Sequence, residues 1–257
     1  MLFANKADSS QAQALRRISL VMALLALIAW VFSDLQITSA NPLFELSLMA
    51  QGFAAPIFLD FPTLLTALLT TLAFAFQAVF VAAILGFLMA LGFRHFWIRS
   101  IAAFIRAIHE LFWALLFIQI SGLTSLTGFL AILIPFTGIF AKVFAEILDE
   151  TDKSPEHSLN PAASFLSKLF YSRIIIAWPQ LRSYTSYRLE CAIRSSAILG
   201  FVGLPTLGFE LESFLKQGEY SQAAAVLYVF FILIASLKYW IKPILLPVYT
   251  LLAFIYL

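Results

Sequence analysis

The sequence has 257 residues, of which 62% are hydrophobic and only 12% are charged, with a net charge of +2 and a mean hydropathy of +0.94. A soluble domain of this length is nearer half apolar and a quarter charged. The apolar residues lie in runs of about 20, the length that crosses a bilayer. Composition therefore excludes a soluble globular protein and predicts an all-α polytopic membrane protein with about six transmembrane helices.

The first sixty residues are predicted to form a cytoplasmic stub, a transmembrane helix over about 18–35 and an external loop. The following apolar stretch, about 62–93, is too long for one minimal span and fits a tilted helix with an overhanging end. The basic run "FRHFWIRSIAAFIRAI" then predicts an interfacial helix that leads into a span at about 109–121.

A short turn separates that span from the next, at about 126–147. The most polar stretch follows, about 150–180, and is expected to be a cytoplasmic loop that contains a short helix over about 161–171 and ends at Pro179. Pro179 is expected to start the next helix.

That helix is predicted over about 181–203, and a Gly- and Pro-containing loop over 204–221 follows it. A last clear span covers about 222–241. Residues 243–257 are apolar but contain Pro243 and Pro247, which predicts a short membrane-associated segment instead of a further full span.

Lysine and arginine positions predict the orientation, because cytoplasmic loops are enriched in both. Residues 18–93 contain neither, which places the acidic loop between the first two spans outside. A topology of six crossings with both termini in the cytoplasm then places the remaining basic segments on the cytoplasmic side. Their basic residues are Arg94, Arg99, Arg106, Lys153, Lys168, Arg173, Lys238 and Lys242.

The helix over 181–203 contains three charges that a plain lipid-spanning segment would not carry: Arg188, Glu190 and Arg194. Each costs on the order of 2.5–3.5 kcal/mol in a span and usually faces a bundle interior or a watery cavity. Glu190 and Arg194 are four residues apart and share a helix face, whereas Arg188 points about 200° away from Glu190. Lys142 and Glu146 form a second pair with the same spacing.

Two interpretations of these charges stay open. They form structural ion pairs that lock helices together, or Arg194 and Arg188 lie along an oxyanion pathway, where a guanidinium matches the geometry of a phosphonate.

No catalytic, cofactor or metal site is predicted. His95, His109 and His157 lie on separate segments without the spacing of metal ligands. The sequence also has neither a GxSxG nucleophile elbow nor a Walker-type phosphate loop. A membrane enzyme is therefore the weaker class.

Several ordered blocks resemble the permease subunit of bacterial phosphonate ABC importers. The segment "RAIHELFWALLFIQISGLTSLTGFLAILIPFTGIFAKVFAEILDE" is similar to a family run that begins Arg-Ala-Ile-Pro-Glu-Leu and ends in Lys-x-x-x-Glu. "YRLECAIRSSAILGFVG" with "LPTLGFEL" resembles the family's Tyr-Arg-x-Glu…Arg…Ile-Leu-Gly-x-Val-Gly segment and the glycine-rich loop behind it. "LLTTLAFA" resembles the start of the first core helix.

The resemblance implies a type I ABC importer transmembrane domain with its permease core at 61–242. Such a subunit is non-catalytic and lies in the bacterial inner membrane, surrounded by lipid. It pairs with a second copy, expected as a homodimer, receives a phosphonate or related oxyanion from an external solute-binding protein, and is powered by two separate ATPase subunits. No nucleic-acid partner is expected.

The resemblance also implies a coupling segment that contacts the ATPase. Counted back from Pro179, the family's Glu-Ala-Ala falls on Asn160, Pro161 and Ala162, and its glycine falls on Leu166. The coupling motif of this chain therefore departs from the family pattern, while Pro179 and the helix after it fit.

An outer gate loop is implied at Gly203, Pro205 and Gly208. Pro205 and Thr206 stand where the family has two glycines, so a stiffer loop is expected here. Two alternative functions remain: a diverged permease paralogue with a regulatory or assembly role, and a stand-alone membrane enzyme acting on lipid phosphates, with Arg188 and Arg194 holding the anion.

Overall fold

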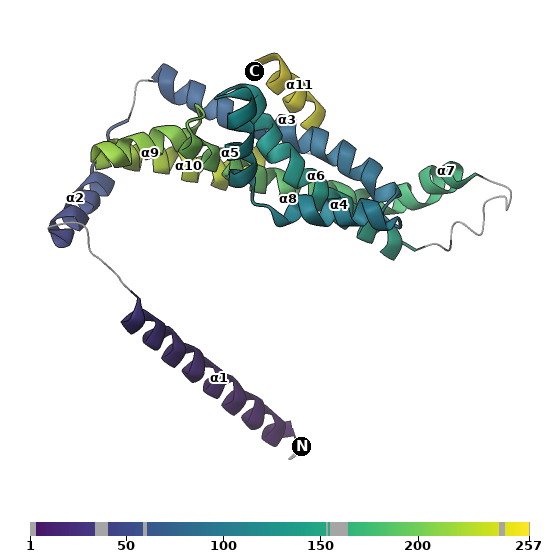
Figure 1. Ribbon diagram of the computed structural model, residues 1–257, viewed down its shortest axis with the longest axis horizontal. Helices are drawn as coiled ribbons and strands as arrows, with labels where there is room; N and C mark the ends of the chain where they lie inside the picture. Colours follow the sequence, from purple (N-terminus) through teal and green to yellow (C-terminus); the bar gives the residue numbers. More distant parts are fainter. Residues whose placement is uncertain are drawn as a thin grey trace. The chain divides into compact units, whose positions relative to one another are not determined.

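The computed structural model describes residues 4–33, 41–58, 61–152, 154, 164–241 and 245–256, and these contain helices but no strand. Two units are distinguished, Met1–Ser47 and Leu48–Leu257. The first contains α1 (Ala4–Phe32) and the beginning of α2 (Pro42–Ala54). The second contains the remaining helices (Figure 1): α3 (Phe61–Leu91), α4 (Phe96–Ala107), α5 (Glu110–Ser121), α6 (Ser125–Glu150), α7 (Phe165–Lys168), α8 (Ile174–Ile198), α9 (Leu207–Gln217), α10 (Tyr220–Trp240) and α11 (Leu246–Tyr256).

Four helical segments are long and apolar enough to cross a membrane singly: Ala12–Phe32, Phe61–Leu91, Ser125–Glu150 and Tyr220–Leu237. Two bent pairs pass the same criterion only together. They are α4 with α5, bent by 91°, and the helix running from Leu166 to Val202 with α9, bent by 46°. The described residues thus contain four membrane-spanning helices, or up to six spans if each bent pair counts as one, in agreement with the predicted number of about six.

Helix α5 shows why the predicted span at 109–121 does not cross alone. Its 12 residues extend about 18 Å, whereas the hydrocarbon core is about 30 Å thick. The bend comes at Ile108 and His109, whose extended backbones separate α4 from α5. The imidazole of His109 then accepts the backbone N–H of Leu111 at 3.2 Å, which caps the start of α5.

The centre of the second unit is the packing of α3 against α6. Every fourth residue of α3 from Ala78 to Ala90 is small and buried, in the order Ala78, Ala82, Gly86 and Ala90. Small residues at this spacing let helix backbones approach closely in a membrane. A Cβ at Gly86 would collide with the Cβ of Phe140 and lie 3.0 Å from the backbone nitrogen of Ala141.

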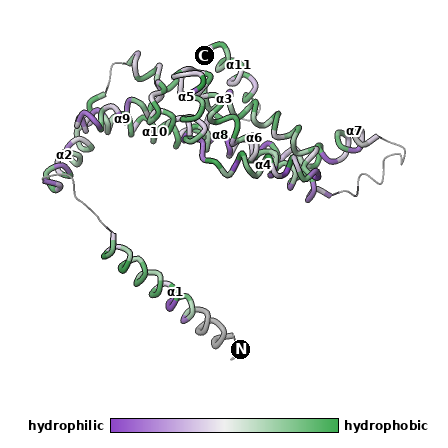
Figure 2. The backbone as a smooth tube through the Cα atoms, in the orientation of Figure 1, coloured by the Kyte–Doolittle hydropathy of each residue, from purple (hydrophilic) through white to green (hydrophobic). Residues whose placement is uncertain are grey.

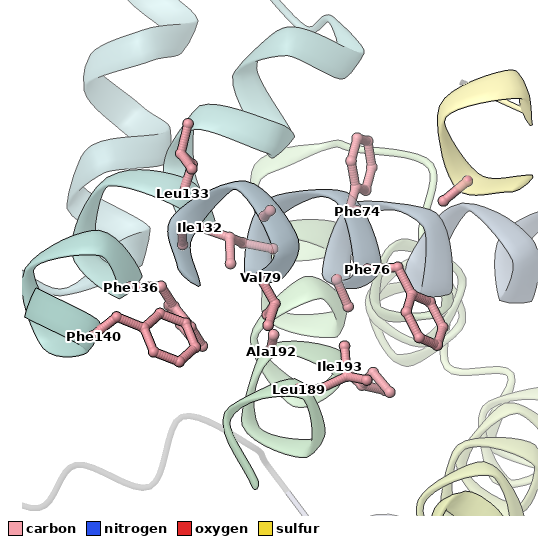
Figure 3. Packing of buried hydrophobic residues seen from close by; sticks show 14 of the residues in the cluster. Phe74, Phe76, Val79, Ile132, Leu133, Phe136, Phe140, Leu189, Ala192 and Ile193 are labelled. Carbon is pink, nitrogen blue, oxygen red and sulfur yellow. The ribbon is translucent and has the colours of Figure 1, made fainter. Parts of the chain in front are cut away.

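Helix α8 completes this core beside α3 and α6. Leu189, Ala192 and Ile193 of α8 lie near Val79 of α3, while Phe136, Phe140 and neighbouring side chains come from α6 (Figure 3). Phe140 and Ile193 are fully buried. The three helices therefore form one apolar cluster that holds the middle of α8 in place.

The C-terminal segment packs on α3 as α11. The buried Gln77 of α3 donates its Nε2–H to the carbonyl oxygen of Ala253 at 2.7 Å. The ring of Tyr249 stacks at an angle against Phe76 and edge-on against Trp240, with centroids 5.4 and 5.9 Å apart. The predicted short segment is thus a helix attached to the core.

Two predicted boundaries were wrong. Pro179 does not start a helix, because α7, a π-helical turn over Leu169–Arg173 and α8 follow one another without a break and Pro179 lies inside α8. The region 204–221 is not a plain loop, since it contains the 11-residue helix α9, which ends at Gly218 in a left-handed conformation. In both places a proline or glycine was taken to interrupt helical structure that the surrounding chain continues.

Candidate functional site

The implied gate loop is the place where α8 and α9 approach most closely. Gly203 ends the short 3-10 helix after α8 with a φ of +93°, which favours glycine. A Cβ on Gly208 would collide with the carbonyl of Ala197, and a Cβ on Gly200 with the backbone nitrogen of Phe209. Glycines at 200 and 208 therefore let the two backbones pass in direct contact, while Pro205 lies in the turn between them.

A threonine from α3 attaches this loop to the core. The hydroxyl of Thr71 accepts the backbone N–H of Leu207 at 3.0 Å and donates to the carbonyl of Ala67 at 2.7 Å. Leu207 begins α9, and its N–H has no partner within that helix. Thr71 is fully buried, so the start of α9 depends on a hydrogen bond from another helix.

Arg188 is held by aromatic side chains of its own helix. Its Nε–H donates to the hydroxyl of Tyr184 at 2.7 Å, and its guanidinium carbon lies 5.2 and 5.5 Å from the ring centroids of Tyr184 and Tyr187. Both distances are in the range of cation–π attraction. Arg188 is half-buried, and these contacts fix its direction without neutralising its charge.

Glu190 and Arg194 share the spacing of a pair but form no ion pair in the described part of the chain. Glu190 is half-buried and Arg194 is exposed. Lys142 and Glu146 of α6 do pair, with Nζ and Oε1 3.1 Å apart. The same i, i+4 spacing thus gives a contact in α6 and none in α8.

Lys142, Arg188 and Arg106 meet at a cavity of about 520 Å³ between α4, α6 and α8. The other lining residues are apolar: Ala103, Ala107, Ile139 and Val143. The lining thus contains three cationic groups and no carboxylate. An arrangement of this kind attracts a small oxyanion, because charge-assisted hydrogen bonds from guanidinium and ammonium groups satisfy its oxygens.

Part of the implied coupling segment is visible. Asn160, Pro161 and Ala162 lie outside the described residues. Leu166 belongs to the single-turn α7 and is 57% exposed, and Pro179 lies in α8. The polar stretch begins where Asp152 accepts hydrogen bonds from the Ser154 hydroxyl at 2.6 Å and backbone N–H at 2.9 Å, which lower the pKa of its carboxyl.

Four residues of this arrangement were not predicted as site residues: Arg106, Tyr184, Thr71 and Gly200. Arg106 was noticed only as a charge that indicates orientation, because one sequence does not reveal which helices enclose a cavity. Tyr184 stands four residues before Arg188, a spacing that places both on one helix face and could have been used. Among the described residues, no group of three or more His, Cys, Asp or Glu is placed to hold a metal ion.

The sequence is similar to bacterial permease proteins, although no protein-family model matches it. A phosphate-import permease protein of Mycolicibacterium smegmatis, PhnE, is 30% identical over 141 residues, which are 54% of this chain and 26% of that protein. A phosphite transport system permease protein of Stutzerimonas stutzeri, PtxC, is 26% identical over 226 residues, 84% of this chain and 82% of that protein. A putative cryptic phosphonate transport system permease protein of Escherichia coli K12, PhnE2, is 25% identical over 43% of this chain and 91% of that protein.

Two solved structures share the fold. The MetNI methionine ABC transporter in an inward-facing form matches with a TM-score of 0.63 and 18% identity, covering 70% of this chain and 93% of that one. An amino acid ABC transporter solved with histidines matches with a TM-score of 0.60 and 17% identity, covering 74% and 93%. The resemblance to phosphonate-type permeases and the ABC importer permease fold, both predicted from the sequence, are thereby confirmed.

Proposed function

We propose that this chain is the membrane-spanning permease subunit of a bacterial ABC importer and carries a phosphonate, phosphite or related oxyanion across the inner membrane. The observation that supports this most is the similarity to the phosphite permease protein, which extends over 84% of this chain and 82% of that relative. The permease fold agrees with it. The two alternatives, a regulatory paralogue and an enzyme acting on lipid phosphates, gain no observation of their own.

The proposed importer has further subunits. The chain carries no phosphate-binding loop, so ATP is hydrolysed in a pair of separate ATPase subunits that contact the polar stretch around α7. A second permease copy and an external solute-binding protein complete it. The orientation remains the one that lysine and arginine favour, with both termini and Arg94, Arg99 and Arg106 on the cytoplasmic side.

The cavity lined by Arg106, Lys142 and Arg188 is proposed to lie on the path of the anion. Arg188 is held toward the cavity by Tyr184, so its N–H groups need little reordering to bind an oxygen. Lys142 shares its charge with Glu146, and an entering anion competes with that carboxylate. Such a site binds weakly enough to release its ligand, as transport requires.

Uptake by the complete importer tests the function. The chain is produced with the ATPase and binding-protein genes that neighbour it, and cells lacking other phosphorus importers are supplied with phosphite, methylphosphonate or phosphate. Growth and accumulation of at least one compound are expected, and both should require this chain. Unchanged accumulation after deletion of the chain contradicts the proposal.

The ATPase contact is tested separately by co-purification. Leu166→Asp places a charge on the exposed side of α7 and is expected to reduce the amount of ATPase recovered at least tenfold. Leu215→Asp, at a partly exposed leucine of α9 on the opposite side of the membrane, is the matched control and should retain the ATPase. Equal recovery with both variants would show that α7 is not the coupling surface.

A further inference from the structure

A second cavity, of about 580 Å³, lies where the end of α3, the amphipathic α4, the last turns of α6 and the π-helical turn before α8 come together. Hydrophilic residues gather in this part of the bundle (Figure 2). Five of the lining side chains are cationic and two are carboxylates, and they are Arg94, Arg99, Arg106, Lys142, Arg173, Glu146 and Asp149. The cavity therefore has an excess of positive charge.

The two carboxylates are already engaged. Glu146 pairs with Lys142 at 3.1 Å, and Asp149 lies 4.0 Å from the Nη2 of Arg94. Arg99 has no ion-pair partner among the described residues, although it lines the cavity beside them. Its guanidinium is available for an external anion, and the internal carboxylates do not neutralise the whole lining.

Helix α4 has the surface of a helix that lies in a membrane interface. Trp97, Ile101 and Phe104 are 75%, 51% and 64% exposed and form one apolar stripe at helical spacing. Arg99 and Arg106, seven residues apart, form a stripe on the other side. The 91° bend between α4 and α5 turns α4 away from the direction in which α5 runs.

Helix α4 packs closely against α6. The carbonyl oxygen of the fully buried Ala102 would lie 2.8 Å from a Cβ on Gly138 of α6. Because a glycine at position 138 lets α4 pack this closely on α6, the basic stripe of α4 is held at the cavity. Its apolar stripe stays exposed on the opposite side of α4, as expected of a helix that lies in a membrane interface.

We propose that this cavity binds the headgroup of an anionic phospholipid of the cytoplasmic leaflet. The phosphate accepts hydrogen bonds from Arg99 and its cationic neighbours, and the first part of the acyl chains contacts the apolar lining residues Leu91, Phe93 and Leu169. Basic pockets between transmembrane helices on the cytoplasmic side are suited to such headgroups. The proposal depends on the orientation given above. Arg106 and Lys142 also line the cavity proposed for the anion path, whereas Arg99 lines only the cavity described here.

A lipid accounts for more of the surface than a free phosphate ion. Free phosphate would use the cationic groups alone and leave the apolar part of the lining without a role. A phospholipid uses both the cationic and the apolar part of the lining, because its charge and its apolar chains are joined in one molecule. The two sources of phosphate are therefore distinguishable by competition.

The test is native mass spectrometry of the full chain purified in detergent, with phosphatidylglycerol, cardiolipin or phosphatidylcholine added. We expect retention of the two anionic lipids over phosphatidylcholine, and a loss of about fivefold in Arg99→Gln, the ratio for removal of one cation near a membrane surface. Arg99→Lys should recover most of the retention. Arg182→Gln, at an exposed arginine outside this cavity, is the matched control and should leave retention unchanged.

A variant with the opposite sign keeps the test decisive if Arg99→Gln is poorly folded. Asp149→Asn removes a negative charge from the lining and should increase retention of phosphatidylglycerol. Equal retention of all three lipids, or equal losses in Arg99→Gln and Arg182→Gln, contradicts the proposal. Displacement of the lipid by millimolar inorganic phosphate would instead assign the cavity to a free anion and also overturn it.

Discussion

Helices α1 and α3 have similar hydropathy but different amounts of burial within their own units. The best window of Ala12–Phe32 has a mean hydropathy of 2.0 and none of it is buried within the first unit, whereas that of Phe61–Leu91 has 2.4 and half of it is buried within the second. Hydropathy therefore identifies both as membrane helices without indicating how far each is buried in its own unit. The difference lies in the side chains that each helix offers to a neighbouring backbone.

Helix α3 offers small and hydrogen-bonding residues on one side. Its row Ala78, Ala82, Gly86 and Ala90 admits α6, and its polar Thr71 and Gln77 bond to α9 and α11. Lipid tails are as apolar as leucine, so helices in a membrane associate through close packing and hydrogen bonds. Helix α1 has alanines three residues apart, at 23, 26 and 29, and its own unit leaves all three exposed.

The largest effect is expected from Gly86→Leu. The new side chain cannot fit between α3 and Phe140, so unfolding should become easier by more than about 3 kcal/mol, and little monodisperse protein should be recovered. Size-exclusion chromatography and thermal denaturation in detergent measure this. Ala26→Leu in α1 is the matched control, with an expected change within about 0.5 kcal/mol. A comparable loss in both variants would mean that α1 is packed as tightly as α3.

The next effect concerns the attachment of the C-terminal helix. Gln77→Leu removes the donor to the carbonyl of Ala253 and leaves a buried acceptor unsatisfied, at a cost of about 2 kcal/mol. Proteolysis of α11 in detergent should become faster. Gln119→Leu, at an exposed glutamine of α5, should leave it unchanged. If α11 stays protected in Gln77→Leu, the ring contacts of Tyr249 alone hold it.

A smaller effect is expected at the gate. Thr71→Val keeps the shape of the side chain but leaves the N–H of Leu207 without its acceptor, at a cost of about 1 kcal/mol. Hydrogen exchange at the start of α9 should accelerate about fivefold. Thr66→Val provides the comparison, because the Thr66 hydroxyl bonds only to the preceding turn of α3. Unchanged hydrogen exchange in Thr71→Val would show that the hydrogen bond from α3 does not stabilise the start of α9.

The smallest effect on stability, and a large one on function, is expected for Lys142→Gln. The pair with Glu146 is partly exposed, so its loss should change the free energy of unfolding by only about 0.3–0.5 kcal/mol. Uptake should nevertheless fall about tenfold or more, because one of three cations is lost from the cavity. Lys216→Gln in α9 removes the same kind of pair, with Glu212, and should affect neither quantity strongly. Full uptake by the Lys142→Gln variant would contradict the proposal that this cavity lies on the path of the anion.

The pattern of apolar residues predicted where the helices lie in the sequence better than it predicted how they are arranged in space. The apolar runs at 62–93, 126–147 and 222–241 match α3, α6 and α10 within a few residues, because a bilayer demands long apolar helices wherever they pack. The interfacial helix before the span at 109–121 agrees with the bend between α4 and α5. The helix within 204–221 was missed, since a short helix lacks the length that makes an apolar run recognisable.

The charged residues of the candidate site were also predicted only in part. Spacing alone anticipated the contact of Lys142 with Glu146, which depends on one helix. It equally anticipated a contact between Glu190 and Arg194, which the structure does not contain, because an i, i+4 spacing permits a pair that is worth only a few tenths of a kcal/mol. A contact between these charges and the substrate stays a prediction.

The sequence by itself determined that the chain is a helical membrane protein, that it resembles phosphonate-type permeases and that its charges are unusual for lipid-facing helices. Only the tertiary structure decided which charges meet. Arg106, Lys142 and Arg188 are far apart in the chain and come together because α4 and α8 both lie beside α6 and border one open cavity. Periodicity records which face of a helix a residue occupies, whereas the packing of small residues between helices decides which faces oppose each other.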